Sequence, residues 1–240
     1  MHKEWINSAH KLNFWMVWRF DFLIKLLNKK KIKLKKSDKI LDFGCGNGTL
    51  SNQLEGKFSV SIDRFDENKN ILLLNKKVNG RLIFKKKQLP KNYYDYVFLF
   101  DVLEHNINDK QLIKNILKLM KKNSFLIINV PALNIFFSKY DSAVGHVKRY
   151  TKSSFLKCTN IKNYKLINCY YWGILLLPFL ILRKINSFYL KKKNKKKIIQ
   201  NGFSVNNFNN KILLLLKRIE LNLFTNMILG TSLMVVMKKK

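Results

Sequence analysis

The chain has 240 residues, a length that favours one domain with an appendage, and 47% of them are hydrophobic. That share can bury a sizeable core and excludes an intrinsically disordered chain. The 47 Lys and Arg outnumber the 14 Asp and Glu, which gives a formal net charge of +33. Such a charge indicates attraction to nucleic acid or to an anionic membrane face. Lysine enrichment in an AT-rich genome would produce the same composition, so the charge alone does not select a partner.

The cysteines are Cys45, Cys158 and Cys169. They form no CxxC pair, so we predict neither a zinc site nor a disulfide framework, and no metal site elsewhere. The odd and sparse count is typical of a reducing compartment, and the polar start of the sequence does not resemble a cleavable signal peptide. We therefore expect a cytoplasmic protein.

The predicted elements alternate between helices and strands. An aromatic-rich amphipathic helix is expected over residues 12–28, followed by a basic linker. Helical spacing of apolar residues predicts further helices at about 48–55 and 109–121. Short apolar runs predict strands at 39–43, 58–63, 81–85, 94–100 and 124–130. Because several of these runs are continuously apolar, they indicate a buried, mostly parallel sheet with helices on both faces.

The last third of the sequence has a different character. A strand is expected at 164–170, an apolar helix at 212–224 and a final strand at 231–237. Residues 170–182 are uncharged, but a membrane span needs about 20 such residues, so the run predicts a buried or interfacial helix. With the basic block at 191–197, it would make the protein peripheral at the inner, anionic face of a membrane. Packing on the sheet or in a dimer interface explains the run equally well, and the oligomeric state is not predicted.

A glycine-rich turn follows the first predicted strand. Gly44 and Gly46 lack a Cβ and allow a ligand to approach the backbone N–H groups at the start of a helix, next to Asp42. Asp63 ends the second predicted strand, nineteen residues after Gly44, where an acid that binds ribose hydroxyls is expected. These residues alone leave a nicotinamide dinucleotide, another nucleotide-like cofactor or a ligand-free turn open.

Two segments make the prediction more specific. Ile-Leu-Asp-Phe-Gly-Cys-Gly-Asn-Gly at 40–48 resembles motif I of the class I S-adenosylmethionine-dependent methyltransferases, and residues 94–105 resemble that family's fourth strand and its continuation. The resemblance covers about residues 37–170, with 126–131 as the fifth strand. It implies that S-adenosyl-L-methionine is the cofactor. It further implies that its methionine end contacts the turn, Cys45 included, and faces Asp101 and His105. Gln88 stands where the family usually has an acid near the adenine, and is the candidate contact there.

Residues 140–151 resemble an Asp…His…Arg-Tyr signature of a methyltransferase subgroup often encoded near surface-polysaccharide or lipid-modifying genes. Ubiquinone-pathway O-methyltransferases carry a looser version. We interpret His146 as the base that takes a proton from the acceptor, Asp141 as the group that orients it, and Arg149 as a partner for a substrate carboxylate or phosphate. A lid histidine bonded only to backbone, and a structural Asp141–Arg149 ion pair, are the alternatives. By analogy, the cap residues Trp15, Trp18 and Arg19 would lie over the site.

The sequence thus predicts an α/β fold with a Rossmann-like, seven-stranded, mostly parallel sheet. We divide it into an N-terminal helical cap (1–36), a cofactor-binding core (37–170), an apolar helical insertion (171–226) and the final strand (227–240). The expected function is methyl transfer to a small-molecule, glycan or lipid-linked acceptor, with O-methylation favoured. A nucleic-acid methyltransferase is less favoured, because Asp101-Val102-Leu103-Glu104 stands where a base-flipping motif like Asn-Pro-Pro-Tyr would follow the fourth strand. A non-catalytic cofactor-binding protein is the third alternative.

Overall fold

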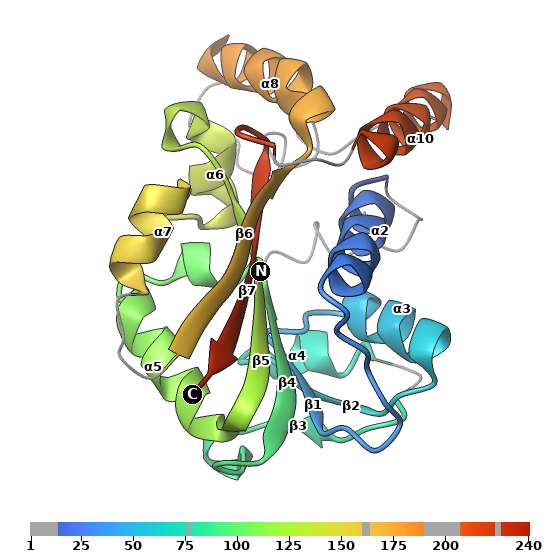
Figure 1. The fold of residues 1–240 in the computed structure, drawn as a ribbon. Coiled ribbons are helices and arrows are strands. Elements are labelled where there is room, and N and C mark those ends of the chain that lie inside the picture. The colour runs from blue at the N-terminus through green and yellow to red at the C-terminus, as the bar shows by residue number, and fades with distance from the viewer. Residues whose placement is uncertain (1–13, 76–77, 160–163, 190–206, 224–226) are drawn as a thin grey trace.

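The computed structural model describes residues 14–75, 78–159, 164–189, 207–223 and 227–240. Within them, seven strands form one sheet in the order β3-β2-β1-β4-β5-β7-β6 (Figure 1). All neighbouring strands are parallel except β7, which is antiparallel to both β5 and β6. The predicted Rossmann-like, mostly parallel sheet is therefore confirmed. The strands are β1 Ile40–Phe43, β2 Ile62–Phe65, β3 Leu82–Ile83, β4 Tyr94–Phe100, β5 Met120–Pro131, β6 Tyr164–Trp172 and β7 Ser232–Lys239.

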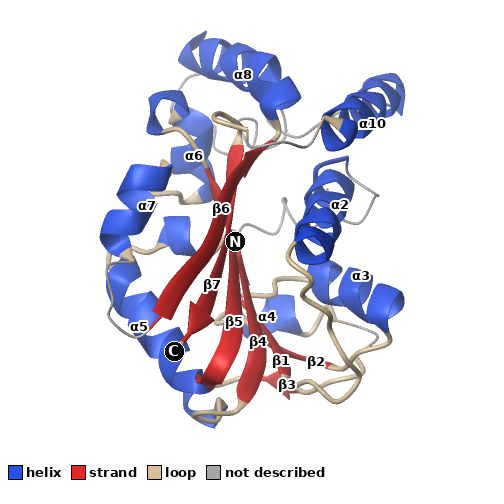
Figure 2. Cartoon of the chain, viewed as in Figure 1, coloured by secondary structure: helices blue, strands red, loops and turns tan. Residues whose placement is uncertain are grey.

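Helices cover the two faces of the sheet, as Figure 2 shows. The face covered by α2 and α3 has its own hydrophobic core, which includes Trp18, Leu54 and Phe98. The opposite face, covered by α5 and α7, has a second core around Ile113 and Phe155. The helices are α2 Phe14–Lys29, α3 Thr49–Phe58, α4 Lys69–Leu72, α5 Asp109–Leu119, α6 Lys139–Val144, α7 Lys152–Cys158, α8 Leu177–Tyr189 and α10 Asn207–Asn222. Four 3-10 turns complete the described elements: η1 Lys86–Gln88, η2 Leu103–His105, η3 Asn134–Phe136 and η4 Ile174–Leu176.

The second strand lies later in the sequence than predicted. α3 continues to Phe58, where Ser59 adopts a left-handed conformation (φ 53°) and ends the helix. β2 therefore begins at Ile62 and ends at Phe65, and Asp63 lies within the strand, opposite Leu41 of β1. The prediction that Asp63 ends this strand is wrong, because apolar Phe58 and Val60 were assigned to the strand instead of to the helix end and the connection.

The apolar run at 170–182 is divided among three elements instead of forming one helix. Residues 170–172 end β6, η4 follows, and α8 begins at Leu177 with Pro178 in its first turn, where a missing backbone N–H is tolerated. α8 contacts α6, and α10 contacts α2. None of the described helices is long and apolar enough to cross a membrane. The basic block at 191–197 lies outside the described residues.

Candidate active site

The glycine turn between β1 and α3 has the backbone geometry that its sequence predicts. Gly44, Gly46 and Gly48 all have positive φ angles of 57–78°, a region that side chains disfavour. A Cβ on Gly44 would lie 2.3 Å from a methyl carbon of Val102, so the turn packs directly against the segment after β4. The N–H groups of Gly44 and Cys45 donate to the carbonyl of Phe65, which fixes the turn at the carboxyl edge of the sheet.

A small pocket, partly open to solvent, lies against this turn. Asp42 enters it from the end of β1 and Asp101 from just after β4, while α2 closes it with Met16 and Arg19. Asp42 is buried, and this burial raises the pKa of its carboxyl to about 6 although Ser51 Oγ donates to it at 2.6 Å. The remaining lining residues are Gly44, Cys45, Gly46, Asn47, Thr49, Leu50 and Phe100.

Asp101 is held by partners from two other elements, one of which is supported by a third. Arg19 of α2 forms an ion pair with it, and Asn129 Nδ2 of β5 donates to it at 2.7 Å. Trp172 Nε1 of β6 donates in turn to Asn129 Oδ1 at 2.9 Å. Sequence reasoning did not identify Asn129 or Trp172 as part of the site. The signal was present, because Asn129 is a polar residue inside the apolar run from Phe125 to Val130.

The acid that faces the turn from β2 is Asp66 instead of Asp63. Asp66 Oδ2 accepts the N–H of Gly46 at 3.0 Å. Asp63 instead pairs with Arg81 at 2.6 Å and accepts the hydroxyl of Tyr94 at 3.0 Å, so its carboxylate is occupied within the sheet. The contact of Asp63 with the ribose hydroxyls stays a prediction, and Asp66 is a second acid beside the turn.

Two other predicted cofactor contacts lie in different places, because Cys45 lines the pocket and Gln88 does not. Burial raises the pKa of the Cys45 thiol, so this side chain stays neutral in the pocket wall. Gln88 is exposed in η1, where its Oε1 accepts the N–H of Lys85 at 2.9 Å. It is absent from the described pocket lining, so its contact with the adenine stays a prediction.

Of the three cap residues predicted to lie over the site, Arg19 lines the pocket. Trp18 is fully buried, and its Nε1 donates to Glu220 Oε1 of α10 at 3.2 Å. Trp15 packs against the ring of Trp172, with ring centroids 4.7 Å apart. These two aromatic side chains therefore support the helix that places Arg19 and Met16 against the pocket.

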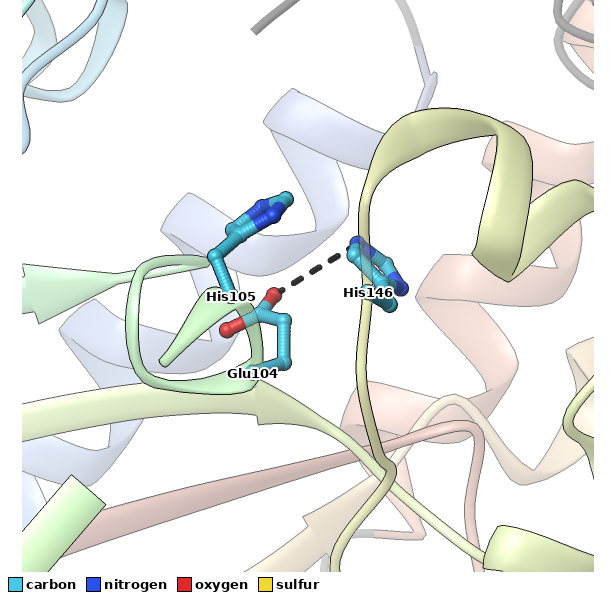
Figure 3. Close-up of side chains that lie close together, drawn as sticks. All are labelled: Glu104, His105 and His146. Carbon is cyan, nitrogen blue, oxygen red and sulfur yellow. Dashed lines mark ion pairs between the residues drawn. The ribbon is translucent and has the colours of Figure 1, made fainter. Parts of the chain in front are cut away.

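A second polar cluster lies after β4, where η2 meets the loop that follows α6. Figure 3 shows Glu104, His105 and His146 close together. Glu104 Oε1 lies 3.8 Å from His146 Nε2, and the rings of His105 and His146 meet edge to face at 4.9 Å. Glu104 is 1% exposed, and neither of its carboxylate oxygens has a hydrogen-bond partner. Burial raises the pKa of Glu104 well above its ordinary value, and the charge of Asp101 adds to the effect.

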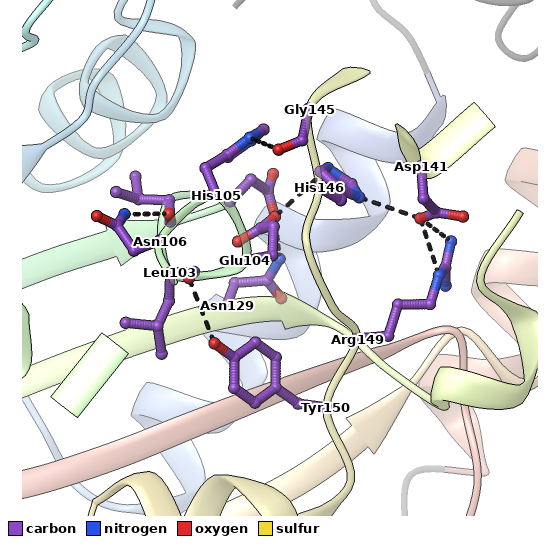
Figure 4. Close-up of polar contacts among 12 residues, drawn as sticks. Leu103, Glu104, His105, Asn106, Asn129, Asp141, Gly145, His146, Arg149 and Tyr150 are labelled. Atoms are coloured by element: carbon purple, nitrogen blue, oxygen red, sulfur yellow. Dashed lines mark hydrogen bonds and ion pairs between the residues drawn. The ribbon is translucent and has the colours of Figure 1, made fainter. Parts of the chain in front are cut away.

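Asp141 of α6 holds His146 from the other side (Figure 4). Its Oδ1 lies 3.0 Å from His146 Nδ1, 2.9 Å from Arg149 Nε and 2.8 Å from a terminal nitrogen of Arg149. Burial by itself would raise the pKa of Asp141, but the hydrogen bond to His146 and the charge of Arg149 outweigh it and hold the pKa well below its usual value. The Asp141–Arg149 ion pair and the Asp141–His146 contact therefore exist together.

Arg149 is positioned to support the loop. It is 5% exposed, and it donates to the carbonyl of Ala132 at 3.1 Å as well as to Asp141. Because its described contacts lie within the protein, the geometry favours a positioning role over the predicted pairing with a substrate anion. Glu104 is a further residue that sequence reasoning missed, since nothing in the sequence distinguishes a buried, unpartnered glutamate from a surface one.

Comparison with known proteins agrees with this geometry. A family model described as a methyltransferase domain matches residues 16–167. The chain is similar to the mitochondrial ubiquinone biosynthesis O-methyltransferase of Schizosaccharomyces pombe, with 23% identity over 180 residues covering 67% of this chain and 64% of the relative. It is also similar to the ubiquinone biosynthesis O-methyltransferase of Pelagibacter ubique, with 30% identity over 117 residues covering 41% of this chain and 47% of the relative. Both matches span less than two thirds of the relative's own length.

The fold has solved counterparts as well. A candidate sarcosine dimethylglycine methyltransferase from Galdieria sulphuraria superposes with a TM-score of 0.61 at 13% identity, covering 92% of this chain and 85% of that one. The family match covers more than half of the chain and includes the glycine turn, the pocket and both histidines. The chain therefore belongs to the methyltransferase domain family.

Proposed function

We propose that this protein transfers the methyl group of S-adenosyl-L-methionine to a hydroxyl oxygen of a small-molecule acceptor. Both similar curated proteins are named as O-methyltransferases of ubiquinone biosynthesis, which supports oxygen as the receiving atom. The observation that carries the proposal is the Asp141–His146 pair, which provides an oriented imidazole close to the residues after β4. Nitrogen acceptors do not generally require such a group, whereas a hydroxyl has to lose its proton.

The cofactor pocket is suited to a ligand with positive charge. S-adenosyl-L-methionine, when bound, supplies a methyl group on a cationic sulfonium and carries an ammonium group as well. Asp42 and Asp101 both face the pocket, and Arg19 holds Asp101 in place. The glycine turn leaves room for the ligand, and Asp66 stabilises the turn by accepting a hydrogen bond from the N–H of Gly46. We assign these residues to the methionine and ribose end of the cofactor.

His146 is the group that we assign to the acceptor. The carboxylate of Asp141 accepts a hydrogen bond from Nδ1 of His146. The lone pair of His146 therefore lies on Nε2, on the side of η2 and Glu104. In the simplest form of the step, the acceptor hydroxyl gives its proton to Nε2 while its oxygen receives the methyl group. Asp141 and Arg149 then act as positioning residues, because they hold the ring in one orientation. His105 lies against His146 and completes this wall of the site.

Turnover measurements with an aromatic diol, 3,4-dihydroxybenzoate, test this assignment. His146→Gln should lower kcat about 100-fold or more, since a positioned base contributes at least that much, while the affinity for S-adenosyl-L-methionine stays unchanged in calorimetry. Asp141→Asn should lower kcat less. Asp95→Asn is the matched control, because Asp95 pairs with Lys121 at the opposite end of β4. Normal turnover by His146→Gln would refute the role of His146, and transfer only to amines would refute the proposed oxygen acceptor.

We further propose that α8 and α10 bring the enzyme to an anionic membrane surface, where a lipid-linked acceptor is reached. α8 exposes Phe179, Ile181, Leu182 and Ile185, each more than 40% accessible. α10 exposes a second apolar set, Ile212, Leu215 and Ile219. The net charge of +33 would attract such a surface, and α8 contacts α6, which carries Asp141.

A further inference from the structure

We infer that Glu104, His105 and His146 bind a divalent transition-metal cation beside the methyl acceptor. One ligand atom from each of the three residues lies within 4.8 Å of the others (Figure 3). Metal binding stands on this geometry alone, whereas its role in the reaction rests on the proposed function above. The cysteine pattern predicted no metal site, but these ligands are two imidazoles and a carboxylate that the fold brings together from two distant segments.

Both histidines are oriented as metal-binding histidines are. His146 Nδ1 contacts Asp141 Oδ1, and His105 Nδ1 contacts the carbonyl oxygen of Gly145, each at 3.0 Å. A carbonyl or a carboxylate can only accept, so each Nδ1 carries the proton and each Nε2 carries a lone pair. Metal-binding histidines typically have such an outer partner, which sets the tautomer and the ring direction.

Glu104 supplies the negative charge that such an ion requires. It is 1% exposed, and both of its carboxylate oxygens lack a hydrogen-bond partner. A buried carboxylate without donors is unfavourable, so an unsatisfied one marks a position where a cation or a proton belongs. His146 Nε2 is the group beside it, 3.8 Å from Oε1, and it too presents a lone pair. Two neighbouring acceptors that face each other are stabilised by a cation between them.

The backbone holds the two ligand-bearing segments together. Val147 N–H donates to the carbonyl of Glu104 at 2.9 Å, and His146 N–H donates to the carbonyl of Asp141 at 2.8 Å. Gly145 has φ 90°, which lets the chain turn sharply between α6 and His146. The ligand atoms of a bound ion lie about 3.4 Å apart, so the side chains need to approach by only about 1 Å. His105 is exposed and has the freedom to make that movement.

The ligand set selects the class of ion. Two imidazoles and one carboxylate suit Zn²⁺, Fe²⁺, Co²⁺ or Mn²⁺ better than Mg²⁺ or Ca²⁺, which prefer oxygen ligands. Three protein ligands leave a coordination position open, as in catalytic zinc sites. An acceptor hydroxyl bound at that position would lose its proton to water more readily, because the ion stabilises the oxyanion. Its oxygen would then receive the methyl group, and His146 would act as a ligand of the ion instead of as the proton acceptor.

Metal analysis of the full-length protein tests the inference. After dialysis against EDTA, the protein should bind one Co²⁺ per chain in titration calorimetry, with visible d–d absorption of a four- or five-coordinate ion. Glu104→Gln and His105→Gln should each weaken this binding at least tenfold. Asp95→Asn, which removes a carboxylate at the other end of β4, should bind Co²⁺ normally.

The outcomes distinguish a failure of the proposed metal site from a failure of the proposed function. If Glu104→Gln and His105→Gln bind Co²⁺ as well as the wild type does, or if the wild type binds none, the metal site is refuted. Circular dichroism and S-adenosyl-L-methionine binding show whether each variant is folded. A chelated enzyme that methylates the diol at full rate would likewise overturn the catalytic role of the ion, yet leave His146 as a base. Absence of transfer with and without metal would instead count against the acceptor.

Discussion

Asp42 shows how burial changes the ionisation of a residue that lines the pocket. It lies one residue before the end of β1 and lines the pocket, and Ser51 of α3 donates to it. Removal from water raises its pKa to about 6, so the free enzyme carries a mixture of neutral and ionised Asp42 near neutral pH. Since the folded-state pKa lies above the unfolded one, the shift stabilises the free enzyme at low pH. That contribution is lost as the pH rises through 6.

Cofactor affinity should show the opposite dependence on pH. The cationic cofactor favours ionised Asp42, so its affinity should rise about tenfold between pH 5 and pH 7, as the carboxyl titrates around 6. Isothermal titration with S-adenosyl-L-methionine measures this dependence. Asp42→Asn should bind more weakly at pH 7 and lose most of the pH dependence, whereas Asp95→Asn should keep the wild-type profile. Parallel profiles for Asp42→Asn and the wild type would contradict this account.

The sequence predicted those site residues whose chemistry is visible in a local pattern. The glycine turn carries its own backbone requirement, and the positions of Asp101 and His146 follow from the resemblance to the family. Asp66 was missed because β2 ends two residues later than predicted, which brings a second acid to the turn. Glu104 was missed because its importance lies in its burial without a hydrogen-bond partner, which no local pattern contains.

At the scale of elements, α8 has two distinct sides. Arg183 lies over the ring of Tyr140 of α6 at 4.2 Å, so one side is packed against the active-site loop. Phe179 and Leu182, one helical turn apart, are 46% and 57% exposed on α8. The prediction of a helix in the uncharged run at 170–182 is confirmed for the residues from Leu177 onward, which belong to α8. It is wrong for the first residues of the run, which complete β6.

Vesicle sedimentation tests the exposed side of α8. The wild type should pellet with phosphatidylglycerol vesicles at low salt, and the double change Phe179→Ser and Leu182→Ser should weaken binding at least tenfold because the buried apolar area is lost. Leu73→Ser is the matched control, since Leu73 is 63% exposed beside α4. If the wild type does not pellet, or if both variants bind alike, α8 does not contact the membrane.

At the scale of the whole molecule, Glu220 joins three parts that are far apart in the sequence. It lies in α10 and is 1% exposed. Its carboxylate accepts Trp18 Nε1 of α2 at 3.2 Å and the N–H groups of Gly173 and Leu175, at 2.6 Å and 3.1 Å, at the end of β6 and the start of η4. The predicted cap and the predicted insertion are therefore connected through one buried side chain.

Removal of that carboxylate should destabilise the whole fold. Glu220→Ala leaves three buried donors unpaired, and each costs about 1 kcal/mol or more, so unfolding in urea should show a loss of at least about 3 kcal/mol. Lys217→Ala, one turn earlier in α10, removes a half-exposed ion pair with Asp21 and should cost much less. Equal stability of the wild type and Glu220→Ala would show that α10 is not coupled to the core.

The overall class of the fold was predictable because a buried parallel sheet leaves continuously apolar runs in the sequence. The order of the strands was not, since periodicity says which residues are buried and not which strands are neighbours. The contact of α10 with α2 was equally hidden, because the residues that make it are about two hundred positions apart.

The position of β7 has a consequence for how the chain is made. β7 lies between β5 and β6 although it follows both in the sequence. During synthesis, β6 therefore emerges from the ribosome with no neighbour to pair with, while the edge of β5 stays open. Until residues 232–239 are translated, β6 is unpaired and one edge of β5 is open, and exposed strand edges of this kind favour aggregation.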